Sequence, residues 1–319
     1  MKKLAVGIDI GGTNTVYGLV DCEGNMYGES SFPTGNYPNF NHYIKTLKDS
    51  IEELISALDY PIELVGIGVG APNANYYSGN IELAPNLPWK GIVPFAKDLE
   101  AQFDNVPVVL TNDANAAAVG EMVYGGAKGM KNFIVVTLGT GVGSGFVCSS
   151  EVLYGHDGFA GELGHVTAVK NGRACGCGKR GCLETYASAT GLKRTVYKYL
   201  AKENMPSTLR SISYDDLTSA KVYEAAIAGD MIAKKVFKYT GEVLGYSLAN
   251  AIQITSPEAI FLFGGLTKAG DLIFEPARKT MEENLIPIFK GKVKLLPSAI
   301  TGANSALLGA SALIWKDYL

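Results

Sequence analysis

The sequence predicts an α/β protein, on two observations. Strand-like apolar segments alternate with helical ones along the 319 residues, and glycine-rich segments follow the strands. Hydrophobic residues make up 47% and charged residues 18% of the chain, which suits a globular protein with a substantial core. The length favours about two domains.

The first third of the chain supplies the first set of strands and helices. Residues 3–21 have the pattern of a strand, a glycine-rich turn and a second strand. A helix is expected over 41–58, where apolar residues recur at helical spacing. Buried strands follow at 64–69 and 107–110. A helix then begins at Asp113, with Asn or Asp as its cap.

The rest of the chain repeats this layout and then becomes mainly helical. A strand at 133–138, a glycine loop and a strand at 145–148 match the arrangement near the start. Further elements are expected as helices at 189–202, 215–228, 230–255 and 303–315, and as strands at 259–263 and 293–296. No linker marks a boundary. We place it near Asp113, with one domain of residues 1–114 plus 303–319 and another of residues 115–302.

The segment from Gly161 to Glu184 carries a cluster of potential metal ligands. It holds Cys175, Cys177 and Cys182, with His165 shortly before them. Thiolate and imidazole are the ligands that Zn²⁺ prefers, and four of them close a structural site. Glu162 and Glu184 bracket the cluster, so a bound ion would also fix two carboxylates near a polar substrate.

Other readings of the cysteines remain open at this point. Three close cysteines could form a disulfide plus a spare thiol, or be buried thiols. The start of the chain lacks a secretory signal pattern, so we expect a cytoplasmic protein, in which disulfides are rare. Cys22 and Cys148 lie in strand-like contexts and are expected to be core thiols.

The turn DIGGTNT, Asp9 to Thr15, has the composition of a phosphate-binding loop. Backbone N–H groups that glycine exposes can ring a phosphate oxygen, and Thr13 and Thr15 add hydroxyl donors. Asp9, at a strand end, is placed to hold Mg²⁺ through water. A hairpin turn without a ligand is the alternative. The residues expected to bind phosphate and its Mg²⁺ here are Asp9, Gly11, Gly12, Thr13 and Asn14.

A second glycine loop, LGTGVGSG at 138–145, repeats this chemistry. One such loop is weak evidence, and a flexible β-turn is its alternative. Two loops, each between strands in separate halves, favour a nucleotide triphosphate bound from both sides. The residues expected to contribute are Gly139, Thr140 and Gly141.

The segment TNDANAAA places Asn112 and Asp113 between a buried strand and a helix of small residues. Open α/β sheets bind ligands at this end of their strands. A carboxylate there could accept the proton of a hydroxyl during phosphoryl transfer. The alternative is that Asp113 only caps its helix.

Taken together, these motifs resemble the ROK sugar kinases. DIGGTNT, NDANAAA, LGTGVGSG, GELGH and CGCGKRGCLE occur in the family's order, and FLFGG at 261–265 is similar to its adenosine-side motif. The cysteine motif is highly specific, whereas the glycine loops are shared with other actin-like ATPases.

The resemblance implies an actin-like (ribonuclease H-like) fold of two α/β domains around a central cleft. It also implies transfer of the γ-phosphoryl of ATP, with Mg²⁺, to a sugar hydroxyl, with Asp113 as general base. Gly264 and Gly265 would contact ATP. His165 would bind zinc through one ring nitrogen and face the sugar with the other. The sugar contacts implied by the motifs are Asn86, Asn112, Asp113, Glu162, His165 and Glu184.

The identity of the sugar is left open by the sequence. GELGH with NDAN resembles glucokinases most, but kinases for N-acetylmannosamine, N-acetylglucosamine, fructose and allose share these motifs. Residues 71–86 are expected to form the walls that discriminate between sugars. The family resemblance also suggests a dimer or tetramer.

Two other classes of protein are less compatible with the sequence. A sugar-responsive repressor needs a DNA-binding domain, and only eight residues precede Asp9. A non-catalytic actin-like assembly module leaves the Cys/His cluster unexplained. The net charge of −3 gives no reason to expect nucleic acid, and no apolar run approaches the roughly 20 residues of a membrane helix.

Overall fold

The computed structural model describes residues 1–104, 106–300 and 305–318 and forms two compact units. Unit 1 contains Met1–Met130, Gly145–Gly161 and Ser298–Leu319, and unit 2 contains Lys131–Ser144 and Glu162–Pro297. The predicted boundary near Asp113 differs from this division, because the helix that begins there packs on the last helix of the chain and so stays with unit 1.

Unit 1 is built on a five-stranded sheet of order β3-β2-β1-β4-β7. β1 pairs antiparallel with β2 and parallel with β4, and β4 pairs parallel with β7. The parallel strands therefore end at one edge of the sheet. The strands are β1 (Lys2–Ile10), β2 (Asn14–Val20), β3 (Met26–Pro33), β4 (Ile62–Gly70) and β7 (Val108–Thr111).

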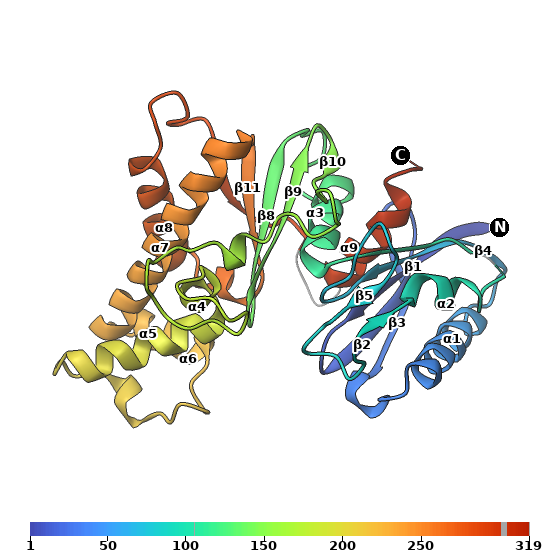
Figure 1. Cartoon of the computed structure of the whole chain (residues 1–319), viewed down its shortest axis with the longest axis horizontal. Helices are drawn as coiled ribbons and strands as arrows, with labels where there is room; N and C mark the ends of the chain where they lie inside the picture. The colour runs from blue at the N-terminus through green and yellow to red at the C-terminus, as the bar shows by residue number, and fades with distance from the viewer. Residues whose placement is uncertain (105, 301–304, 319) are drawn as a thin grey trace. The chain divides into compact units, whose positions relative to one another are not determined.

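Helices pack on this sheet to close the core of unit 1 (Figure 1). Helix α9 packs on β1, β4 and α3, whereas α1 contacts β2 and β3. Asn39 caps α1 by accepting the N–H of His42 at 3.0 Å. Unit 1 also contains the short 3₁₀ turn η1 and the two-stranded hairpin of β5 and β6. The bounds of these elements and of the helices are η1 (Thr34–Asn36), α1 (Phe40–Ser56), β5 (Ile81–Glu82), β6 (Ile92–Val93), α2 (Phe95–Glu100), α3 (Asp113–Val123) and α9 (Ser305–Trp315).

The core of unit 1 lies between the sheet and α1. Ile8 of β1, Leu47 of α1 and Phe95 of α2 are fully buried in the same cluster, and Trp89 from the connection before α2 is buried beside them. Burying each aliphatic side chain of this kind contributes about 1.5–3 kcal/mol. This packing holds β1 in place, and β1 carries Asp9 at its end.

A second five-stranded sheet has the order β10-β9-β8-β11-β12. In chain order this is the same topology as the first sheet, which confirms the repeated layout expected from the two glycine loops. β8 pairs parallel with β11, and β11 pairs parallel with β12. The strands are β8 (Phe133–Leu138), β9 (Val142–Cys148), β10 (Glu151–Val152), β11 (Ala259–Phe263) and β12 (Lys294–Pro297).

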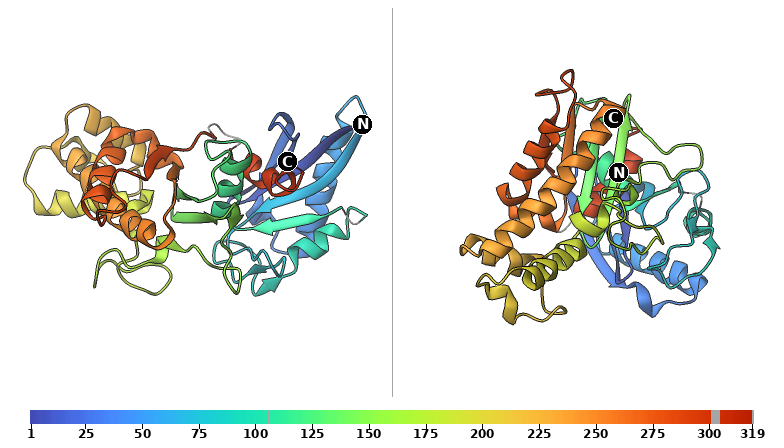
Figure 2. Two further views of the ribbon diagram at one scale, coloured as in Figure 1. Left: turned by 90° about the horizontal axis from the view of Figure 1, so that it is seen from above. Right: turned by 60° about the vertical axis from the view of Figure 1, so that its left-hand side comes forward.

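Helices make up most of unit 2, and Figure 2 shows α7 and α8 beside each other in two further views. The long helix α7 packs against α8 and against α4, α5 and α6. Asp230 caps α7 by accepting N–H groups from Ile232 and Ala233. The bounds are η2 (Leu163–His165), α4 (Glu184–Ala187), α5 (Ala189–Lys202), η3 (Thr208–Ser211), α6 (Ser219–Ile227), α7 (Met231–Thr255), η4 (Gly265–Ala269) and α8 (Asp271–Glu283).

Several features differ from the expectations or lie outside them. The sequence pattern did not indicate β3, α2 or α8, and the helix expected from 215 begins at Ser219. Cys22 is exposed and Cys148 is only partly buried, so the expectation that both are core thiols is wrong. Residues 303, 304 and 319 of the expected closing segment lie outside the described residues.

Among the helices of the described ranges, none combines the length and apolar character needed to cross a membrane.

Candidate active site

The carboxyl edge of the unit 1 sheet brings two of the sequence motifs together. Asp9 of β1 is in register with Gly70 of β4, and Gly70 is in register with Thr111 of β7. Adjacent strands lie about 4.8 Å apart, so Asp9 and Thr111 are about 10 Å apart across the sheet. Asn112 and Asp113 follow Thr111 directly. The first glycine turn and the proposed base therefore share one edge.

Asn112 and Asp113 divide two roles at the start of α3. Asn112 is the N-cap, because its Oδ1 accepts the N–H of Asn115 at 2.7 Å. The alternative that Asp113 itself caps the helix is therefore wrong. Asp113 instead accepts the N–H of Ala114 at 2.8 Å and its side chain remains exposed to solvent.

Both carboxyl groups at this edge have raised pKa values. Although solvent reaches Asp113, desolvation by the neighbouring protein raises the pKa of its carboxyl, and the N–H of Ala114 opposes the shift. For Asp9, burial and then the charge of Asp113 raise the pKa to about 6. A raised pKa makes a carboxylate a better proton acceptor near neutral pH.

The first glycine turn is shaped by its contact with the segment that carries Asn86. A Cβ on Gly12 would lie 2.6 Å from the carbonyl oxygen of Asn86, so only glycine allows this approach. Gly11, Gly12, Thr13 and Asn14 lie between or next to the two strands, and the last three are exposed. The turn closes through a hydrogen bond of 2.9 Å from the N–H of Gly11 to the carbonyl of Asn14.

Thr15 does not supply a hydroxyl to this turn. Its side chain is fully buried and its Oγ1 hydrogen-bonds Thr34 Oγ1 at 2.9 Å and Tyr43 Oη at 2.8 Å. The expectation that Thr15 donates to phosphate is therefore wrong. The hydroxyl instead links β2 to η1 and α1.

The segment 71–86, expected to sense the sugar, packs on a second loop of unit 1. Asn75 donates from Nδ2 to the carbonyl of Asp157 at 2.7 Å. The ring of Tyr76 stacks on Tyr154 with centroids 4.0 Å apart and planes nearly parallel. Tyr77, in contrast, is 61% exposed, whereas Tyr76 is only partly exposed.

The second glycine loop, Gly139 to Gly141, links β8 to β9 in unit 2. The N–H of Val142, directly after it, donates to Glu184 Oε2 at 3.1 Å. A Cβ on Gly141 would lie 2.4 Å from the same oxygen, so a side chain there would push the Glu184 carboxylate away from the N–H of Val142.

The adenosine-side motif lies at the same end of the second sheet. Gly264 and Gly265 follow β11, whose last residue, Phe263, is in register with Thr137 of β8. Because β8 runs into the second glycine loop, the two motifs share one edge of this sheet, as the first glycine turn and Asp113 do in unit 1.

The four predicted metal ligands come together in unit 2. The ligand atoms of His165, Cys175, Cys177 and Cys182 all lie within 4.8 Å of one another. The sulfurs of Cys177 and Cys182 are 3.7 Å apart, and His165 Nδ1 is 3.7 Å from the Cys175 sulfur. Ligands at the corners of a zinc tetrahedron with Zn–S bonds of about 2.3 Å are about 3.8 Å apart. The donors therefore fit a tetrahedral metal ion.

The spacing of the sulfurs also excludes a disulfide in this arrangement, since an S–S bond is about 2.0 Å long. Without a metal the thiols would titrate differently from one another. Burial raises the pKa of Cys175 to about 12, whereas the N–H of Lys179 lowers the pKa of Cys177. A bound cation would favour the thiolate form of all three.

The segment from His165 to Cys182, called the metal loop here, is flanked in the sequence by two predicted sugar ligands, Glu162 and Glu184. Since Nδ1 of His165 faces the sulfurs, Nε2 is the ring nitrogen left for another partner. The short turn η2 that carries His165 is held by a hydrogen bond of 3.1 Å from the N–H of Leu163 to Ser144 Oγ. Glu162, directly before it, is exposed, and Glu184 is partly buried.

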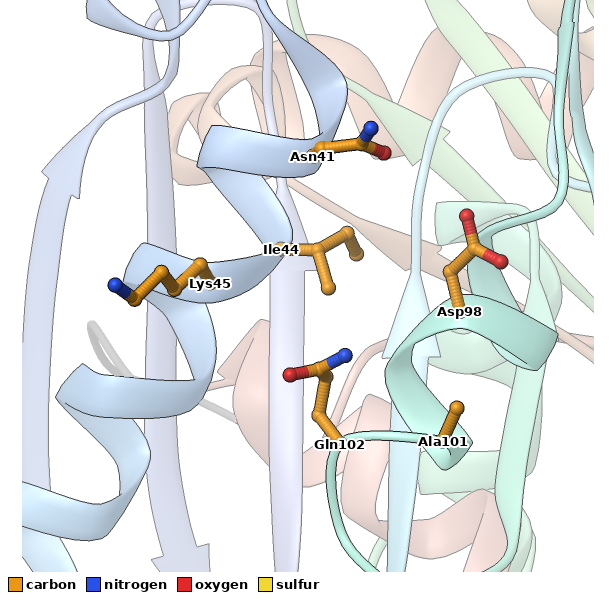
Figure 3. A pocket seen from close by; sticks show the side chains of 6 residues that line it. All are labelled: Asn41, Ile44, Lys45, Asp98, Ala101 and Gln102. Atoms are coloured by element: carbon orange, nitrogen blue, oxygen red, sulfur yellow. The ribbon is translucent and has the colours of Figure 1, made fainter.

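A cavity elsewhere in unit 1 contains none of the predicted site residues. It has a volume of about 280 Å³ and lies between α1 and the end of α2 (Figure 3). Its lining mixes amide, charged and apolar side chains without a cluster of catalytic or metal-binding groups. These residues are Asn41, Ile44, Lys45, Asp98, Ala101 and Gln102.

One group of supporting residues was missed by sequence reasoning. The N–H of Ala189 donates to the carbonyl of Gly139 at 2.9 Å, and the hydroxyl of Thr190 donates to the carbonyl of Thr140 at 3.2 Å. Both lie at the start of α5, which Ser188 caps by accepting the N–H of Gly191. The Ser cap is a visible signal for the helix, but nothing local indicates its contact with the glycine loop.

Comparison with known proteins supports the relation that the motifs suggested. The glucokinase of Halalkalibacterium halodurans is 37% identical over 288 residues, which cover 88% of this chain and 86% of the relative. The xylose repressor of Bacillus spizizenii is 31% identical over 317 residues, which cover 99% of this chain and 78% of the repressor.

Solved structures show the same fold. A ROK family glucokinase from Streptomyces griseus, in complex with glucose and AMPPNP, superposes with a TM-score of 0.78 at 32% identity and covers 97% of this chain and 98% of its own. This similarity confirms the actin-like ATPase fold. The family model described as ROK family matches residues 5–317. The chain belongs to the ROK family.

Proposed function

We propose that the protein is an ATP-dependent sugar kinase that transfers the γ-phosphoryl group of ATP to a hexose, with glucose as the preferred substrate. The main support is the shared edge of the unit 1 sheet, where Asp9, in the first glycine turn, lies two strands from Asp113. Family membership and the glucokinase relatives give independent support. The S. griseus enzyme was solved with glucose and AMPPNP, which correspond to the sugar and the nucleotide that we propose as ligands of this chain.

Asp113 is the general base in this proposal. Its carboxylate is exposed and carries a raised pKa, so it can accept the proton of the attacking sugar hydroxyl. Asn112 uses Oδ1 for the helix cap, which leaves Nδ2 to donate to a neighbouring hydroxyl of the sugar. Phosphoryl transfer otherwise requires mainly positioning and charge neutralisation.

ATP would be bound by the N–H groups and hydroxyls of the glycine loops. The first loop offers Gly11, Gly12, Thr13 and Asn14, and the second offers Gly139, Thr140 and Gly141. Asp9 would hold Mg²⁺ through water, and the ion, when bound, neutralises charge on the transferred phosphoryl group. Gly264 and Gly265 would contact the adenosine.

The sugar would be held by polar side chains of the predicted motifs. Besides Asp113, we assign Asn86, Asn112, Glu162, His165 and Glu184 to this role. Zinc on His165, Cys175, Cys177 and Cys182 would be structural. It would fix the tautomer of His165 and so make Nε2 a dependable partner for a sugar hydroxyl.

A second candidate function is sugar sensing without catalysis, which the xylose repressor relative favours. A sensor would bind the sugar but release no ADP in response to it. A coupled ADP-release assay with and without glucose separates the two functions. Glucose-stimulated ADP release is the result we expect.

The same assay, run with a panel of sugars, tests the preference for glucose over N-acetylmannosamine, N-acetylglucosamine, fructose and allose. A higher kcat/KM for another member of the panel would reassign the substrate but keep the kinase. If calorimetry shows sugar binding while no sugar stimulates ADP release, the sensor is the better description.

A further inference from the structure

The segment that follows the third cysteine of the metal cluster also supports the second glycine loop. Cys182 is separated from Glu184 by a single residue, and α4 then leads through Ser188 into α5. The carboxylate of Glu184 lies between the two sites. Its Oε1 is 3.7 Å from the sulfur of Cys175, and its Oε2 accepts the N–H of Val142 at 3.1 Å.

Three contacts fix the backbone of the glycine loop to this segment. Besides the bond from Val142 to Glu184, the carbonyl of Gly139 accepts the N–H of Ala189, and the carbonyl of Thr140 accepts the hydroxyl of Thr190. A loop expected to bind phosphate through N–H groups works only if those groups are held in a fixed orientation. The segment 184–190 provides this orientation.

The metal loop is attached to the same helices at its other end. Arg173, shortly before Cys175, donates from Nη1 to the carbonyls of Thr185 at 2.7 Å and Gly191 at 2.9 Å. Its guanidinium also lies over the ring of Tyr186, 4.5 Å from the centroid. The loop is therefore joined to α4 and α5 both before and after its cysteines.

We propose that Glu184 is a positioning residue that couples the metal cluster to the nucleotide loop, so that metal occupancy sets nucleotide affinity as well as sugar affinity. The inference rests on the proposed nucleotide site and adds a role for Glu184 beyond sugar contact. Metal on Cys182, two residues before Glu184, would fix the start of α4 and so hold Glu184 against Val142. Without metal, the segment that leads into α4 would lose this anchor, and the N–H groups of the glycine loop would lose their orientation.

The test measures binding of AMPPNP in the absence of sugar, with metal content determined for each sample. We expect chelation under reducing conditions to weaken AMPPNP binding to the natural protein about fivefold or more, within the usual range of coupling between sites. Glu184→Ala should bind AMPPNP weakly whether metal is present or absent. Glu184→Gln should restore the metal dependence, because its amide oxygen can still accept the N–H of Val142.

Thr190→Val provides the matched control. It removes a loop contact that does not pass through Glu184, so it should weaken AMPPNP binding but keep the effect of metal. Equal AMPPNP affinity of the metal-loaded and metal-free natural protein would overturn the proposal. So would a full metal effect in Glu184→Ala.

A second measurement covers the case in which the metal-free protein does not stay folded. Hydrogen exchange of the peptide that contains Val142 is compared between metal-loaded Glu184→Ala and Glu184→Gln. Faster exchange only in the alanine variant supports the coupling, and equal exchange contradicts it. Absence of AMPPNP binding in every metal-loaded form would instead count against the proposed kinase function.

Discussion

The pair Asn112-Asp113 shows how two neighbouring polar residues can serve different purposes. Asn112 caps α3 by accepting a backbone N–H of its first turn, so the cap does not require the side chain of Asp113. The carboxylate of Asp113 then stays exposed at the same edge of the sheet as a second carboxylate, on Asp9, whose pKa it raises. Like charges that interact in this way are unfavourable for stability, so their presence at one edge is better explained by function.

Replacement of Asp9 should show that its charge lowers the stability of the folded protein. Burial and Asp113 raise the pKa of Asp9 from 3.8 to about 6, so the folded protein binds the proton more readily than the unfolded chain. The stability that Asp9 contributes is therefore greatest below pH 4 and falls as the pH rises to about 6. At pH 7.5 the Asp9→Asn variant should be more stable by up to about 3 kcal/mol.

Urea unfolding at pH 7.5 and pH 4 measures this difference. The gain in stability of Asp9→Asn should shrink towards zero at pH 4, while kinase activity should be lost at both pH values if Asp9 holds the hydrated Mg²⁺ as proposed. An equal change in stability at the two pH values would show that the pKa of Asp9 is not raised by folding.

At the scale of elements, the two glycine turns depend on close backbone approaches. Gly12→Ala places a Cβ 2.6 Å from the carbonyl oxygen of Asn86, so the turn or the Asn86 segment must move. We expect the KM for ATP to rise about tenfold or more, because a shift of about 1 Å in a positioning loop can cost on the order of a hundredfold.

Gly35→Ala is the control for this variant. Gly35 lies in η1 of the same unit, and a Cβ there meets no atom within 4 Å. Its steady-state kinetics should match those of the natural protein. If Gly12→Ala also leaves the KM for ATP unchanged, the first turn does not bind the nucleotide.

The metal loop is the second element with a clear prediction. Cys177→Ser removes one of four donors, so metal content measured by mass spectrometry should fall well below one ion per chain. The KM for sugar should rise as His165 loses its anchor. Cys22→Ser, at an exposed cysteine outside the cluster, should keep its metal. Full zinc content in Cys177→Ser would remove that residue from the ligand set.

At the scale of the whole molecule, short motifs and periodic patterns predicted most of the fold. The strands that lead to Asp9 and Asp113 were found because they are apolar and are followed by glycine or polar residues. Helix α8 was not found because Pro276 lies inside it, and proline usually ends a helix. Strand β3 was not found because most of its side chains are at least partly exposed and its apolar residues do not alternate.

In the candidate site, too, some features could be predicted from the sequence and others could not. The grouping of His165 with the three cysteines could be predicted because their residue types and spacing are specific by themselves. The buried hydroxyl of Thr15 and the support of the glycine loop by Ala189 and Thr190 could not be predicted. These contacts join residues far apart in the sequence, and no local pattern encodes them.

We propose that the whole molecule moves a phosphoryl group from ATP to glucose with Asp113 as the base. The most direct measurement is a single-turnover assay of glucose 6-phosphate formation by the natural protein and by Asp113→Asn. Asp271→Asn serves as control, since Asp271 is also an exposed aspartate in the first turn of a helix.

We predict glucose 6-phosphate from the natural protein and from the control. The Asp113→Asn rate should be lower by about 10²–10⁴-fold, with glucose binding retained. A near-normal rate in Asp113→Asn, or no glucose 6-phosphate from the natural protein, would contradict the account.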